Sequence, residues 1–229
     1  MSPRAGSSSA SRARSRSATS NTSPTVTSWS GRWTTAIGSP ACSVPGVARQ
    51  LGRGAVAVGS TGLAGDEQAD RVNHGGPYKA AYAYAREDAA WWEQQLGRPL
   101  EAGAFGENLT LAGVDITGAR IGERWRIGSA EFEVSGPRVP CSKLGARMGD
   151  PRFPKRFVLA GRPGAYLAVV TPGTVQGGDP VAVVHRPEHD VTVGLVFEIA
   201  LRDRARLAEL DPARADMNPE LLSWLYRAA

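Results

Sequence analysis

The stretch that decides the fold is IGERWRIGSAEFEV, residues 121–134. Apolar and polar side chains alternate along it: Ile121, Trp125 and Ile127 fall on one face, and Phe132 resumes the pattern beyond a Gly-Ser pair. Alternation with a period of two predicts strands with one buried face, and the Gly-Ser pair predicts a tight turn between them. The stretch therefore predicts an antiparallel β-hairpin.

Similar short segments flank this hairpin on both sides. Five of them carry apolar runs bounded by Gly or Pro turns and are predicted as strands: 55–58, 80–84, 109–111, 166–170 and 181–185. The clearest helix is Arg86–Leu96, which begins with two acidic residues and is followed by Gly97. We therefore expect a mainly β protein, an antiparallel barrel with one or two internal helices.

After Pro187 the pattern becomes helical. Val196, Ile199 and Leu210 fall on one helical stripe, and Asn218 is a good N-cap for a last helix. We therefore expect a small α-helical appendage on the barrel. The predicted domain boundaries are a barrel over 24–187 and a helical extension over 188–229.

The first 23 residues are rich in Ser and Arg and carry almost nothing apolar. Such a segment buries too little surface to offset its ordering entropy, so we predict disorder over 1–23. A transit peptide and a misplaced start codon or shifted reading frame are the alternatives. Residues 24–54 have weak periodicity, and no element is predicted there.

The positive charge of the chain is concentrated at its start. Residues 1–65 hold seven arginines and no acid, so the whole-chain charge of +5 leaves −2 for the remaining residues. We therefore expect no nucleic acid as a partner. No apolar run approaches the length of about 20 residues that a membrane span needs, so no membrane partner is expected. Two distant cysteines form no disulfide framework, and cytoplasmic localisation is the expectation.

The segment PRVPCSKL, residues 137–144, is the first candidate for chemistry. Pro137 and Pro140 precede Cys141 and favour a rigid turn or strand end over a helix interior. Arg138 and Lys143 are close in sequence, and nearby cations favour the thiolate, the form that attacks electrophiles and binds metals. A buried structural cysteine is the alternative.

Two glycine-rich loops carry further polar side chains. The first, HGGPYK, contains His74 and Lys79, and the second, GAFGENLT, contains Glu107 and Asn108. Polar groups on several rigid loops are typical of a site. Each also has a plainer interpretation: His74 closes a turn, Glu107 and Asn108 cap the loop backbone, and the cations are solvated. A Cys–His pairing of Cys141 with His74 is conceivable, but no protease signature surrounds either residue.

Five blocks together resemble the MOSC domain, the C-terminal domain of molybdenum cofactor sulfurases. They are HGGPYKA at 74–80, GAFGENLT at 103–110, IGERWRIG at 121–128, PRVPCSKL at 137–144 and GRPGAYLAVVTPGTVQGGD at 161–179. The resemblance covers roughly 55–187 and implies a β-barrel similar to the pyruvate kinase barrel. The stretch Thr34–Gly38 resembles a remnant of an earlier barrel strand, and 39–52 departs from the family.

The resemblance also implies a cofactor and its ligands. A molybdenum–pterin cofactor is expected, with Cys141 as the metal ligand, since a soft thiolate suits molybdenum. The cations expected to hold its phosphate and pterin are Lys79, Arg138, Lys143, Arg147 and Arg162. The residues expected beside Cys141 in catalysis are His74, Glu107 and Asn108. Pyridoxal phosphate is mentioned for the family, but the half of the sulfurases that binds it is absent here, so none is expected.

Two functions follow from the resemblance. Reductase members remove oxygen from N-hydroxylated compounds such as hydroxylaminopurines and amidoximes. A small-molecule substrate and a separate flavin or iron–sulfur electron donor are then the expected partners. The alternative is a non-enzymatic carrier of sulfur or of the molybdenum cofactor, using a persulfide on Cys141.

Overall fold

The computed structural model describes residues 24–30, 51–52, 54–65 and 76–227. The strands are β1 (Thr25–Ser30), β2 (Leu51–Gly52), β3 (Val56–Gly59), β4 (Gly62–Leu63), β5 (Ala81–Ala85), β6 (Leu109–Ala112), β7 (Arg124–Ile127), β8 (Ala130–Pro137), β9 (Ala165–Thr171), β10 (Gly173–Val175) and β11 (Val181–His185). The helices are η1 (Pro77–Lys79), α1 (Arg86–Leu96), α2 (Ser142–Met148), α3 (Phe153–Ala160), α4 (Val193–Arg202), η2 (Arg204–Ala213) and α5 (Pro219–Tyr226), with η marking 3₁₀ turns. The protein is mainly β, as predicted.

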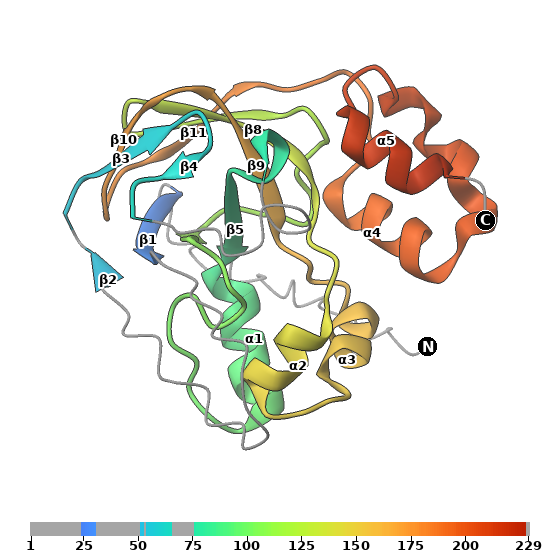
Figure 1. Cartoon of the computed structure of the whole chain (residues 1–229), viewed down its shortest axis with the longest axis horizontal. Helices are drawn as coiled ribbons and strands as arrows, with labels where there is room; N and C mark the ends of the chain where they lie inside the picture. Colours follow the sequence, from blue (N-terminus) through green and yellow to red (C-terminus); the bar gives the residue numbers. More distant parts are fainter. Residues whose placement is uncertain (1–23, 31–50, 53, 66–75, 228–229) are drawn as a thin grey trace, which may run out of the picture.

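The main sheet is a nearly closed barrel. Its strand order is β11-β7-β8-β9-β5-β6-β1, extended by β2, and β5–β6 is its one parallel pair. The predicted hairpin is confirmed: β7 and β8 are antiparallel, and Trp125 faces Phe132 across the pair. Both side chains are fully buried inside the barrel. A smaller sheet, β10-β3-β4, lies beside the barrel (Figure 1).

Strand β1 closes the barrel. It pairs with β6 on one side, and on the other the Val26 N–H donates to the Asp179 carbonyl while the Gly178 N–H donates to the Val26 carbonyl. The sequence did not predict this strand, because the segments that it joins in the barrel, β6 and residues 178–179, lie far along the chain and its own alternation is short. The predicted strand remnant at 34–38 and the predicted disorder of 1–23 lie outside the described residues.

Helices α1, α2 and α3 gather at one end of the barrel (Figure 1), one more internal helix than expected. The predicted limits of α1 are confirmed. Helices α2 and α3 are short, and Gly145 lies within α2, where glycine is a poor helix former. A Cβ at Gly145 would lie 3.0 Å from the Asp150 carbonyl and 3.2 Å from Pro154. The glycine therefore allows the two helices to pack closely.

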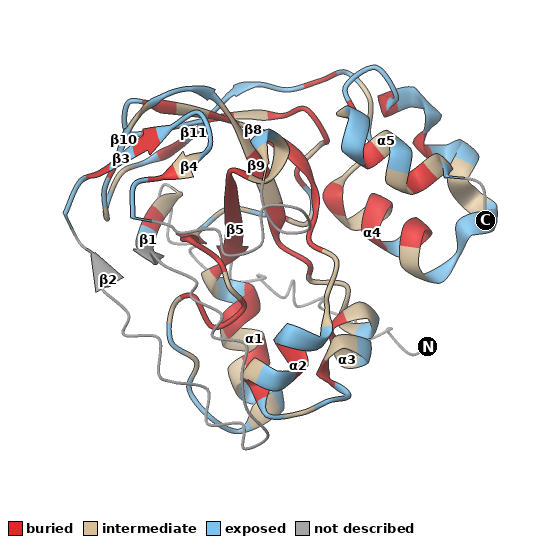
Figure 2. Cartoon of the chain, viewed as in Figure 1, coloured by how far each residue is buried: buried red, intermediate tan, exposed pale blue. Residues whose placement is uncertain are grey.

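Beneath these helices lies a separate aromatic core. It contains Trp92 from α1, Phe105 from the second glycine-rich loop, and Phe153 and Phe157 from α3, all buried. Ring centroids of Trp92 and Phe153 are 4.7 Å apart. Figure 2 shows buried and exposed residues side by side on these helices, at the end of the barrel. This packing fixes the position of α2, and with it the segment that holds Cys141.

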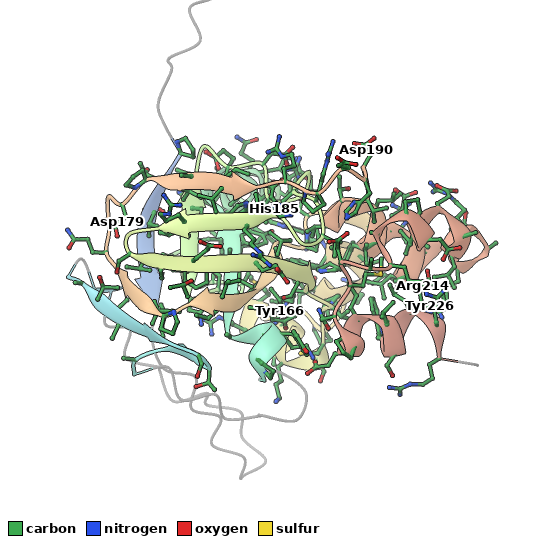
Figure 3. All side chains as sticks on the ribbon, turned by 90° about the horizontal axis from the view of Figure 1, so that it is seen from above. Tyr166, Asp179, His185, Asp190, Arg214 and Tyr226 are labelled. Carbon is green, nitrogen blue, oxygen red and sulfur yellow. The ribbon has the colours of Figure 1, made fainter. Side chains whose placement is uncertain are left out.

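The predicted helical extension is present as α4, η2 and α5, to one side of the barrel (Figure 1). Val196 and Ile199 of α4 are buried, and the Asn218 side chain caps α5 by accepting from the Leu221 N–H, as the sequence predicts. Arg214 lies 4.4 Å above the Tyr226 ring within the extension (Figure 3). None of the helices in the described ranges has the length and apolar character needed to cross a membrane.

Candidate functional site

Cys141 lies at the junction of a barrel strand and a helix. Strand β8 ends at Pro137, and Cys141 is the extended N-cap residue of α2, with φ −127°. The predicted position at a strand end outside a helix interior is confirmed. The residue is half-buried, so its thiol is reachable while its backbone is held. A helix N-terminus carries partial positive charge, which stabilises an anionic group there.

A cavity of about 640 Å³ opens at Cys141. Its walls come from four separate parts of the chain: Tyr78 and Lys79 of η1, Ser135–Pro137 and Val139–Cys141 at the end of β8, Tyr166 of β9, and residues 218–227 in and around α5. Tyr166 is labelled in Figure 3 and lies where the barrel meets the helical extension. The cavity is therefore built between the barrel and the extension.

Two polar contacts fasten the α5 segment to the cavity, and a third joins the neighbouring walls. Lys79 Nζ lies 2.9 Å from Glu220 Oε2, and Asn218 Nδ2 donates to the Ser135 carbonyl at 2.9 Å. The Ser135 hydroxyl in turn donates to the Tyr78 carbonyl. These contacts hold the α5 side chains against Cys141, so the extension is a fixed wall of the site. The sequence did not predict this wall.

Arg138 lies behind the cavity wall, between the lining residues Pro137 and Val139. Its side chain is buried, and its guanidinium carbon lies 5.4 Å from the centroid of the Tyr82 ring. Within the described part of the chain, its buried Nη1 has no hydrogen-bond partner. A buried N–H without an acceptor is costly, so this atom is a donor with unused hydrogen-bonding capacity. Burial raises the pKa of the neighbouring Tyr166, although Arg138 acts to lower it.

Glu107 and Asn108 organise the second glycine-rich loop. The Glu107 carboxylate accepts from the Gly103 N–H and from the Phe105 N–H at 3.0 Å, and Asn108 Oδ1 accepts from the Tyr82 N–H at 2.6 Å. Burial raises the pKa of Glu107, although the hydrogen bonds from the Gly103 and Phe105 N–H groups act to lower it. Neither residue lines the cavity, and the geometry matches the capping interpretation. Their part in catalysis stays a prediction.

The remaining predicted cations are spread over the helices. Arg147 donates to the Gly103 carbonyl at 2.6 Å, and Lys143 lies exposed on α2. Arg162 forms an ion pair with Asp88 and lies 4.8 Å from the Trp91 ring, near α1. The structure thus places Cys141 and Lys79 on one cavity, keeps Arg138 buried behind the lining residues Pro137 and Val139, and places Arg147 and Arg162 in contacts elsewhere.

The described residues offer few protein ligands for a metal ion at this site. His74 lies outside the described residues. Within the described ranges, no group of three or more His, Cys, Asp or Glu side chains could hold a metal ion. A metal at Cys141 would thus take one thiolate from this part of the chain and further ligands from a cofactor.

Comparison with known proteins shows which family this chain belongs to. The model of the MOSC domain matches residues 70–182. The uncharacterized protein YflK of Bacillus subtilis (strain 168) is 36% identical over 166 residues, 72% of this chain and 75% of that protein. This chain belongs to the MOSC family.

Other MOSC relatives extend the comparison. The crystal structure of YiiM from Geobacillus stearothermophilus superposes with a TM-score of 0.70 at 27% identity, covering 88% of this chain and 99% of that one. A protein of Gibberella moniliformis (strain M3125 / FGSC 7600) named "Reductase" is 34% identical over 145 residues, 61% of this chain and 25% of that protein. This chain thus spans a quarter of the fungal reductase.

The MOSC match ends at residue 182, before the helical extension begins. Cys141, Lys79 and Arg138 lie inside the matched region, while Glu220 and Trp224 of the cavity wall lie outside it. The family domain therefore supplies the cysteine, and the extension supplies the opposite wall of the cavity.

Proposed function

We propose that this MOSC protein binds the molybdenum–pterin cofactor and reduces N-hydroxylated compounds with electrons from a separate flavin or iron–sulfur protein. The observation that carries the proposal is the cavity of about 640 Å³ that opens at Cys141. A volume of this size is that of a small-molecule site. The name of the fungal relative, "Reductase", supports the same class of reaction.

The residues at the cavity fit the cofactor. Cys141 offers a soft thiolate for the metal, and the unpaired buried Nη1 of Arg138 offers a donor for an anionic phosphate or pterin oxygen. Lys79 adds a second cation, although Glu220 balances its charge. When bound, the molybdenum centre would supply the two-electron chemistry at the N–O bond.

The overall reaction needs two electrons and two protons. The N–O bond of the substrate breaks, the nitrogen is reduced to the amine, and the oxygen leaves as water. The cavity walls hold the substrate for this step: the Tyr78, Tyr166 and Trp224 rings offer flat contact for a planar base. The Lys79–Glu220 pair offers hydrogen bonds to its polar edge.

The test is reduction of 6-N-hydroxylaminopurine and of benzamidoxime by protein from a host that makes the cofactor, with dithionite-reduced methyl viologen as donor. The parent protein is expected to form adenine and benzamidine. Cys141→Ser, which replaces the thiolate with a hard oxygen, is expected to lose nearly all activity, and Cys42→Ser is the matched control. Equal rates in the parent and Cys141→Ser would overturn the proposal. A loaded parent that turns over neither substrate would favour a carrier of sulfur or cofactor.

A further inference from the structure

The segment that follows the site cysteine is strongly basic. Residues 138–162 contain seven arginines and lysines and one acid, Asp150, a net charge of +6. Because residues 66–229 together sum to −2, the rest of that region carries −8. The charge of residues 66–229 is therefore unevenly divided along the sequence, and the basic segment includes α2 and α3.

Helix α3 presents a stripe of these cations to solvent. Arg152, whose side chain is 91% exposed, is followed at helical spacing by Lys155, Arg156 and Leu159. Leu159 is 60% exposed, the most exposed large apolar side chain among the described residues. The opposite side of the helix holds two buried phenylalanines. We call Arg152, Lys155, Arg156 and Leu159 the α3 face; Figure 2 shows α3 at the outside of the molecule.

The single acid of the segment does not neutralise the α3 face. Asp150 Oδ2 lies 3.3 Å from Arg156 Nη1, and Asp150 Oδ1 lies 3.8 Å from Arg152 Nε. The backbone hydrogen bond from Arg152 and the two arginines lower the pKa of Asp150, so it is ionised near neutral pH. One carboxylate among three cations leaves the face positive. An exposed apolar side chain within a charged rim is the usual composition of a protein-docking surface.

We propose that the α3 face docks an acidic electron-donor protein. This rests on the reductase function proposed above, because a donor must deliver electrons close to Cys141. Helix α2 has seven residues, and its rise of about 1.5 Å per residue separates its far end from Cys141 by roughly 10 Å. A protein bound on α3, just beyond α2, therefore lies near the site.

Charge complementarity selects the partner. The rest of residues 66–229 is net negative and repels an acidic protein, while the α3 face attracts it. The electrostatic field of these residues therefore orients an acidic donor toward α3. Nucleic acid would also bind the cations, but it gains little from the exposed leucine. An acidic flavodoxin or ferredoxin fits both the charge and the apolar centre.

The experiment uses full-length loaded protein and two acidic donors, a purified flavodoxin and a plant-type ferredoxin, each kept reduced by its NADPH-dependent reductase. Lys155→Glu and Leu159→Ser alter the α3 face, and Arg126→Glu makes the same charge change at an exposed position on β7. Rates with reduced methyl viologen are measured beside them. Binding of each donor, and of a labelled 20-base-pair DNA duplex, is measured by fluorescence anisotropy at low and high salt.

We expect Lys155→Glu to lower kcat/KM for an acidic donor roughly tenfold at low salt and less at high salt. Rates with viologen should stay at the parent level, and Arg126→Glu should match the parent with both donors. Parent-like donor kinetics in Lys155→Glu, no binding of either donor, or binding of DNA alone would overturn the proposal. If viologen drives no reduction but Lys155→Glu still weakens donor binding, the proposed function fails while the docking surface stands.

Discussion

Replacing Glu107 tests whether this buried carboxylate shapes the loop. In Glu107→Ala the Gly103 N–H and the Phe105 N–H lose their acceptor, and the Thr110 hydroxyl loses a contact of 3.3 Å. Leaving a buried donor unsatisfied costs about 1–3 kcal/mol. Relief of the carboxylate's own burial, which raises its pKa, and water entering the vacated space offset part of this cost. We expect a net loss of about 2–4 kcal/mol in the free energy of unfolding.

The assay is urea unfolding followed by tryptophan fluorescence, since Trp92 and Trp125 are fully buried. Glu188→Ala removes an exposed carboxylate and should change stability by no more than about 0.5 kcal/mol. At low temperature, where Glu107→Ala stays folded, its cofactor content should match the parent. A variant that keeps parental stability and cofactor but loses turnover would refute the reasoning and place Glu107 in the chemistry.

Three further predictions concern the walls and core of the site. Glu220→Gln removes the half-exposed ion pair with Lys79 and should lower the free energy of unfolding by less than about 1 kcal/mol in urea titrations. A larger loss would mean that the pair is better shielded from solvent than its exposure indicates. Gly164→Ala should lower the melting temperature much more than Gly178→Ala. Both glycines have positive φ, but a Cβ at Gly164 would lie 2.5 Å from a β5 carbonyl, whereas nothing lies within 4 Å of a Cβ at Gly178. Equal shifts of the two melting temperatures in calorimetry would contradict this prediction. Burial raises the pKa of Tyr84 well above 10.0, so the unfolded chain loses the phenol proton at a lower pH than the folded protein does. The free energy of unfolding should therefore fall as pH rises above about 10, and Tyr84→Phe should make this fall less steep. An unchanged dependence of the free energy of unfolding on pH in Tyr84→Phe would contradict this prediction.

Local patterns predicted much of the fold. The limits of α1 follow from its acidic first turn and Gly97, and the β7–β8 hairpin follows from alternation around a Gly-Ser turn. Strand β1 was missed because the segments that it joins in the barrel, β6 and residues 178–179, are far along the chain. Helices α2 and α3 were missed because they are short and because Gly145, where the two helices pack closely, has a low helix propensity.

The site was predicted only in part for a similar reason. The sequence could single out Cys141 after Pro137 and Pro140, and it grouped the nearby cations by their closeness in the chain. The structure divides that group: Arg138 stays beside the cavity, whereas Arg162 pairs with Asp88. The wall from α5 could not be predicted, because Glu220 meets Lys79 only once the extension has packed on the barrel.

The most direct test of the account is the molybdenum and pterin content of purified protein from a cofactor-making host. The parent and Cys42→Ala are expected to carry close to one molybdenum and one pterin per chain. Cys141→Ala is expected to lose most of the metal while remaining folded by circular dichroism. Equal molybdenum in Cys141→Ala and the parent would contradict the claim that Cys141 holds the metal.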